Sequence, residues 1–121
     1  MKGTIKASSD ISALFDEGKK ISSKSMILMY RPTPAKRDRH GRVAFIAGKK
    51  VGNAPHRNRA KRLLREAARQ AGLPTFGWDI ALVARPSIVR EPFSSIESQL
   101  MKMALQGELL KAHDDRDDLT Q

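Results

Sequence analysis

The sequence contains no cysteine among its 121 residues. This absence excludes a disulfide framework, a thiol nucleophile and a zinc site with thiolate ligands. It is compatible with the cytoplasm, which is the location we expect. Phe, Trp and Tyr together amount to six residues, so a long series of aromatic side chains stacked on successive bases is not expected.

Long hydrophobic runs are also missing. No apolar run approaches the ~20 residues of a membrane-spanning helix, and the first ten residues, MKGTIKASSD, lack the apolar segment of a secretory signal. We therefore expect no membrane partner. The length suits one domain with a modest core, which we place at residues 1–112. Residues 113–121 form an acidic tail with too little apolar content to pack, and we expect it to be disordered.

The chain shows no arrangement of residues typical of a catalytic site. Its three histidines, His40, His56 and His113, have no metal-ligand spacing between them. No glycine-rich phosphate loop, Ser/His/Asp set or two-metal carboxylate cluster is visible. The sequence therefore predicts a binding protein with no catalytic side chain of its own, and it leaves open whether the protein itself binds a metal ion.

Positive charge is abundant and concentrated in one part of the chain. The net charge is +10 and the isoelectric point is about 10.4, which makes a polyanion the expected partner. Residues 36–69 contain twelve Lys or Arg and two acids, whereas residues 114–118 read DDRDD. The electrostatic contact with a polyanion is therefore expected within residues 36–69.

A basic amphipathic helix is predicted at the end of this segment. Apolar residues recur with helical spacing from Ala60 to Ala71. Pro55 suits a first helical turn, and Gly72 suits a helix end. Arg62, Arg65 and Arg69 fall on one flank together with Asn58, with Lys61 at its border, and Arg57 and Arg59 lie at the helix start, where the helix dipole favours an anion. A solvated helix face is the alternative, but such faces usually mix charges, and residues 57–69 hold one acid.

The other elements indicate a small α+β domain. We predict a helix over 10–17, a strand over 21–31, a second strand over 42–51 antiparallel to the first, the basic helix over 55–71, a buried strand over 78–84 and a last helix from Phe93. The order α-β-β-α-β-α predicts a two-layer α/β (α+β) sandwich on a mixed sheet. Its strand–helix–strand unit implies two parallel strands, for which a right-handed crossover is the general rule.

The basic segment closely resembles the signature of the bacterial ribonuclease P protein component. That signature is a strand ending in lysines, then V-G-N-A, then R-N-R-x-K-R-x-x-R-E. The matching residues here are Val51, Gly52, Asn53 and Ala54, followed by Arg57, Asn58, Arg59, Lys61, Arg62, Arg65 and Glu66. The resemblance implies a left-handed crossover around the basic helix, in place of the usual right-handed one.

The resemblance also implies a function. The chain would be the protein subunit of ribonuclease P, which assists a catalytic RNA and its Mg²⁺ in removing the 5′ leader of precursor tRNA. The expected partners are the ribonuclease P RNA subunit and precursor tRNA, and no DNA. The residues expected to contact the catalytic RNA are Lys49, Lys50, Asn53, Arg57, Asn58, Arg59, Lys61, Arg62, Arg65 and Arg69.

A cleft for the single-stranded leader is the second surface that the resemblance implies. Its positions correspond to Ile11, where the family often has Phe, to Phe15, and to an aromatic strand position that aligns with Met29. Tyr30 is the neighbouring alternative, and a shift of one residue along a strand reverses the face. Ordinary core packing is the competing interpretation of these four residues. Two other functions stay open: a structural rRNA-binding protein, and a stand-alone metal-dependent nuclease.

Overall fold

The computed structural model describes residues 4–34 and 39–113. Three helices and four strands follow one another along the described chain: α1 (Ser8–Glu17), β1 (Lys19–Ser22), β2 (Met26–Pro32), β3 (Arg42–Ile46), α2 (Ala54–Ala71), β4 (Trp78–Ala84) and α3 (Phe93–Gln106). Short 3-10 turns at Lys49–Val51 and Pro86–Arg90 precede α2 and α3. The predicted α+β class is confirmed, and the acidic segment 114–121 lies outside the described residues.

The four strands form one mixed sheet in the order β1-β2-β4-β3. β3 and β4 are parallel, as predicted, with Val43 opposite Ile80. The predicted antiparallel pairing of the strand at 42–51 with the preceding strand is wrong, because β4 lies between them and pairs antiparallel with β2. The composition of β4 explains this order: its WDIALVA sequence suits a central strand covered on both faces, whereas the shorter β3 lies beside it at the edge.

The predicted single strand over 21–31 is a β-hairpin. β1 and β2 pair antiparallel, with Ile21 opposite Leu28, and the polar residues Ser23, Lys24 and Ser25 form the connection. The Ser23 N–H donates to the carbonyl of Met26 at 2.8 Å, which closes the turn. This turn was not predicted, because it contains neither glycine nor proline, the strongest turn signals.

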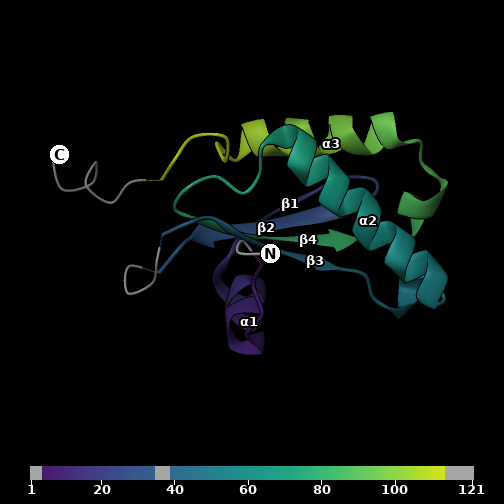
Figure 1. The fold of residues 1–121 in the computed structure, drawn as a ribbon, viewed down its shortest axis with the longest axis horizontal. Coiled ribbons are helices and arrows are strands. Elements are labelled where there is room, and N and C mark those ends of the chain that lie inside the picture. The colour runs from purple at the N-terminus through teal and green to yellow at the C-terminus, as the bar shows by residue number, and fades with distance from the viewer. Residues whose placement is uncertain (1–3, 35–38, 114–121) are drawn as a thin grey trace, which may run out of the picture.

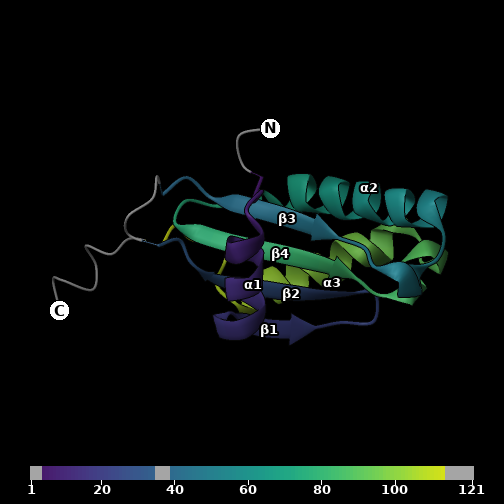
Figure 2. The ribbon, with the colours of Figure 1, turned by 90° about the horizontal axis from the view of Figure 1, so that it is seen from below.

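The helices cover both faces of the sheet. α1 lies across one face, and α2 and α3 lie side by side on the other (Figures 1 and 2). The larger core fills the α2–α3 side and includes the fully buried Leu64, Leu82 and Leu100. A smaller core under α1 is built around Leu14 and Met29.

The crossover from β3 through α2 to β4 is left-handed. Figure 2 views the sheet from the α1 side, with β3 and β4 pointing the same way and α2 behind them. In this view β3 and β4 point to the right, the chain returns through α2 on the far side of the sheet, and β4 lies below β3. This arrangement is left-handed. The resemblance therefore gave the correct handedness, and the general right-handed rule did not.

Candidate nucleic-acid interface

The basic helix α2 has the two faces that its sequence predicted. Its apolar positions Ala60, Leu64 and Ala68 are almost completely buried against the sheet and α3. The polar flank is exposed and carries Asn58, Arg59, Arg62, Arg65 and Arg69. The helix is thus anchored by one side while its cations face solvent.

Most of these cations have no acidic partner among the residues that the structure describes. Within residues 4–34 and 39–113, no carboxylate forms an ion pair with Arg59, Arg62 or Arg65. Arg69 differs, because its guanidinium lies 2.5 Å from the Glu66 carboxylate. Hydrogen bonds from Arg69 and then Gln70 lower the pKa of the partly exposed Glu66. Phosphate binding by the helix is therefore expected from the unpaired arginines, with Arg69 largely compensated by Glu66.

The start of α2 combines a structural cap with basic side chains. The Asn53 side-chain oxygen accepts a hydrogen bond from the backbone N–H of His56 at 3.1 Å. Gly52 precedes this cap with a φ of 137°, a conformation that favours glycine. The exposed Lys49 and Lys50 lie on the preceding 3-10 turn. Arg57 follows the cap, and its Nε is buried and has no hydrogen-bond partner within the described residues.

Replacing Asn53 by alanine is expected to lower the free energy of unfolding by about 1 kcal/mol, because the first turn of α2 loses its cap. Thermal unfolding of the free protein measures this effect. Asn53→Asp, which keeps the acceptor, is the matched control and should retain the stability. An unchanged melting temperature in the alanine variant would show that the cap is dispensable.

The structure separates the four residues assigned to the leader cleft. Ile11 and Met29 pack together in the core under α1, where Met29 is 1 % exposed. Phe15 is on the same helix and is 42 % exposed. Tyr30 points to the opposite face of the sheet and belongs to the larger core. Met29, not Tyr30, therefore shares a face with Ile11.

A cavity of about 320 Å³ joins this α1 side to the basic helix. The N-terminal region, the edge strand β3 and two cations of α2 form its walls. The lining residues are Thr4, Ile5, Ile11, Ala44, Phe45, Ile46, Lys61 and Arg65. The Arg65 guanidinium lies 5.3 Å from the centre of the Phe45 ring, a cation–π contact. Phe45 was not among the predicted site residues, because nothing in the sequence of β3 shows that α2 packs beside it.

A buried ionic network attaches α1 to the sheet. Asp79 of β4 has no solvent exposure and accepts two hydrogen bonds from Arg42, at 2.5 and 3.1 Å. Arg42 also reaches Asp10 of α1 at 3.3 Å, and Thr33 donates to Asp79 at 3.0 Å. The hydrogen bonds to Asp79 raise the pKa of Arg42, so its charge is permanent. Asp10 therefore acts mainly as the link between α1 and the sheet.

Groups of metal ligands and membrane-spanning helices are both missing from the described residues. In the described part of the chain, no three His, Asp or Glu side chains are grouped so that they could hold a metal ion. No helix of that part is long and apolar enough to cross a membrane.

Known proteins with similar sequences and structures point to one family. The sequence profile described as Ribonuclease P matches residues 2–107. The ribonuclease P protein component of Brevibacillus brevis is 34 % identical over 112 residues, which cover 88 % of this chain and 84 % of that protein. The Dehalococcoides mccartyi component is 40 % identical over 75 residues, or 62 % of each chain.

Solved structures agree with this result at the level of the fold. The Staphylococcus aureus RNase P protein superposes with a TM-score of 0.78, covering 90 % of this chain and 98 % of that one at 22 % identity. The Thermotoga maritima protein gives a TM-score of 0.71 over 92 % and 98 % of the two chains, also at 22 % identity. With the profile match over most of its length and the V-G-N-A and R-N-R residues at the start of α2, this chain belongs to the family of bacterial ribonuclease P protein components.

Proposed function

We propose that this chain, as a ribonuclease P protein component, binds the catalytic RNA through α2 and the single-stranded 5′ leader of precursor tRNA beside α1. The observation that supports this most strongly is a set of cations that form no ion pair within residues 4–34 and 39–113, on a helix whose opposite face is buried. A rigid row of such side chains can neutralise phosphates without first breaking ion pairs within the protein.

The contact with the catalytic RNA is assigned to the start and the exposed flank of α2. The residues are Lys49, Lys50, Asn53, Arg57, Asn58, Arg59, Lys61, Arg62, Arg65 and Arg69. Arg59, Arg62 and Arg65 contribute most, because they are exposed and have no ion pair among the described residues. Asn53 acts mainly by fixing the first turn of the helix.

The leader is assigned to the α1 side of the sheet. Ile11 and the partly exposed residues of β3 offer apolar contacts in the cavity whose far wall carries Lys61 and Arg65. Phe15 lies outside this cavity and adds an exposed aromatic ring on α1. Bases would lie against the apolar side chains while phosphates meet the cations. Met29 is buried beneath this surface. The Tyr30 side chain lies on the opposite face of the sheet and is not part of it.

Catalysis is proposed to reside in the RNA subunit together with its Mg²⁺. We assign no reaction step to a protein side chain. A cytoplasmic location is proposed, since precursor tRNA is made there.

The decisive experiment measures cleavage of precursor tRNA at low Mg²⁺ by the protein, by a bacterial ribonuclease P RNA, and by both together. We expect cleavage at the mature 5′ end in the mixture only. Cleavage by the protein alone would instead identify a stand-alone nuclease. RNA binding without any gain in cleavage would favour a structural rRNA-binding protein.

A further inference from the structure

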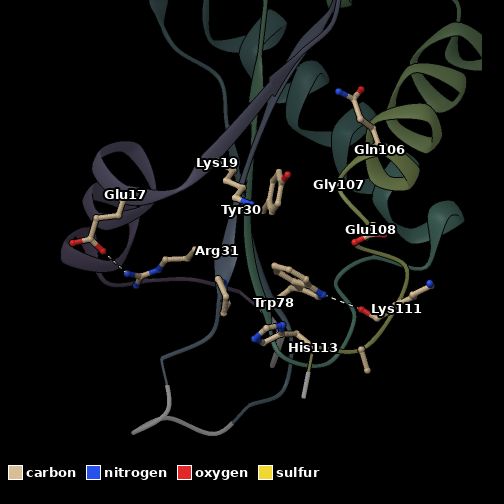
Figure 3. Close-up of a pocket in the computed structure, with 12 residues that line it drawn as sticks. Glu17, Lys19, Tyr30, Arg31, Trp78, Gln106, Gly107, Glu108, Lys111 and His113 are labelled. Atoms are coloured by element: carbon tan, nitrogen blue, oxygen red, sulfur yellow. Dashed lines mark hydrogen bonds and ion pairs between the residues drawn. The ribbon is translucent and has the colours of Figure 1, made fainter. Parts of the chain in front are cut away.

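A second pocket, of about 540 Å³, lies on the α3 side of the sheet (Figure 3). Lys19 of β1, Tyr30 of β2 and Trp78 of β4 form its floor, and the segment that follows α3 forms the facing wall. Its volume falls in the range of roughly 300–1,000 Å³ typical of small-ligand sites. It is separate from the cavity of about 320 Å³ beside α1, because the two share no lining residue.

Three aromatic rings line this pocket in a fixed arrangement. Tyr30 and Trp78 meet edge to face with ring centres 5.8 Å apart, and Trp78 and His113 lie 5.0 Å apart. The indole N–H of Trp78 donates to the carbonyl of Lys111 at 2.9 Å. This bond orients the indole while leaving its ring partly exposed to the pocket.

Two glycines allow the facing wall to come this close. Gly77 has a φ of 85°, and a Cβ there would overlap the carbonyl oxygen of His113. A Cβ on Gly107 would come within 3.1 Å of the Tyr30 ring. His113 also donates its backbone N–H to Phe76 at 2.9 Å. The wall is therefore attached directly to the start of β4.

Charged side chains of both signs line the pocket: the cations are Lys19, Arg31 and Lys111, and the carboxylates are Glu17 and Glu108. Arg31 and Glu17 form an ion pair with each other at 3.3 Å. Lys19 lies beside the Tyr30 ring (Figure 3) and supplies a cation. Glu108 supplies a carboxylate from the facing wall, and its φ of 58° makes it the one non-glycine residue with positive φ in the described chain. This left-handed conformation belongs to the turn that ends α3, in which the N–H of Leu109 donates to the carbonyl of Ala104 and the N–H of Glu108 donates to the carbonyl of Leu105.

We propose that this pocket binds one unpaired nucleotide of a single-stranded RNA. The base stacks on Trp78, an amino group on its edge donates a hydrogen bond to Glu108, and Lys19 attracts the phosphate. Each group matches one part of a nucleotide, since aromatic rings stack on bases and carboxylates accept from exocyclic amines such as cytosine N4. This site is additional to the α2 surface and the α1 cavity.

The test uses the fluorescence of Trp78, which is the only tryptophan in the chain. Oligocytidylate of about five nucleotides, a length that suits a single-strand site, should quench it saturably. A duplex of the same length should not, because its bases are already paired. Glu108→Gln and Lys19→Ala should each weaken the quenching constant about tenfold, the order of one base contact, while Lys102→Ala on the exposed side of α3 should leave it unchanged.

The fluorescence assay tests the pocket separately from the proposed RNA contact of α2. Quenching by cytidine monophosphate should survive in the Arg62→Ala/Arg65→Ala variant, so failure of one site does not imply failure of the other. Equal quenching by duplex and single strand, or quenching unaltered by both pocket variants, would overturn the proposal.

The source of the nucleotide can be found in the holoenzyme. If it comes from the leader, Glu108→Gln should raise KM for a precursor with a full leader and not for one with a trimmed leader. If it comes from the RNA subunit, the variant should weaken assembly with that RNA regardless of the leader. Either result supports the site, and wild-type behaviour in both experiments would overturn its role in the holoenzyme.

Discussion

Replacing Arg42 by alanine is expected to lower the free energy of unfolding by about 3–5 kcal/mol, the usual cost of leaving one charge of a buried pair without its partner. Asp79 is fully buried and receives two of its hydrogen bonds from Arg42. Without the guanidinium, Asp79 keeps the Thr33 hydroxyl and the more distant Arg31, whose guanidinium is 4.0 Å away. Urea unfolding followed by circular dichroism measures the loss.

Two further variants separate charge from packing at this network. Arg90→Ala, at an exposed arginine, should change stability by less than ~0.5 kcal/mol. The double variant Arg42→Met/Asp79→Leu should be more stable than Arg42→Ala, since no buried charge is left unpaired. A loss below ~1 kcal/mol in Arg42→Ala would mean that Asp79 is satisfied by other groups, and that the link from the sheet to Asp10 is weak.

The double substitution Arg62→Ala/Arg65→Ala is expected to weaken binding to the ribonuclease P RNA by on the order of 100-fold, because two charge-assisted contacts to phosphate are lost. The dependence of the RNA-binding affinity on salt concentration should also change. The log–log slope of affinity against salt concentration should become shallower by roughly 1.4–1.8, which is 0.7–0.9 for each phosphate no longer neutralised. Filter binding over a range of salt concentrations measures both quantities.

The controls for this prediction come from the same helix. Arg69→Ala should have a smaller effect on affinity, since Glu66 already compensates that charge. Arg62→Ala should leave thermal stability nearly unchanged, and Arg65→Ala should cost up to about 1 kcal/mol through its contact with Phe45. An unfolded double variant, or a salt slope identical to that of the wild type, would contradict the assignment of these arginines to phosphate.

The parts of the fold that the sequence predicted well are those encoded locally. The spacing of Ala60, Leu64 and Ala68 fixes both faces of α2, and Gly72 ends the helix in the left-handed conformation expected of it. The seven residues of β4 were predicted with their observed bounds. In each case the information lies within one element and its flanking residues.

The parts that were missed depend on which segments meet in space. Nothing in the sequence near Arg42 indicates that β4 will lie between β2 and β3. The burial of Asp79 within an apolar strand is explained by the ion pair with Arg42, which also contacts Asp10. The choice between Met29 and Tyr30 was open for the same reason. Alternation along a strand shows that Met29 and Tyr30 lie on opposite faces of the sheet. Only the position of α1 shows which of these faces it covers.

The sheet order has a consequence for the growing chain during translation. β4 is the last strand made and yet fills the middle of the sheet. Until residue 84 has left the ribosome, β2 and β3 each expose an edge whose intended neighbour does not yet exist. Such edges can pair with other chains. The chain is therefore most prone to aggregation during translation, before β4 has been made. The pairing of β2 with β4 also spans some fifty residues, a long-range contact that slows folding.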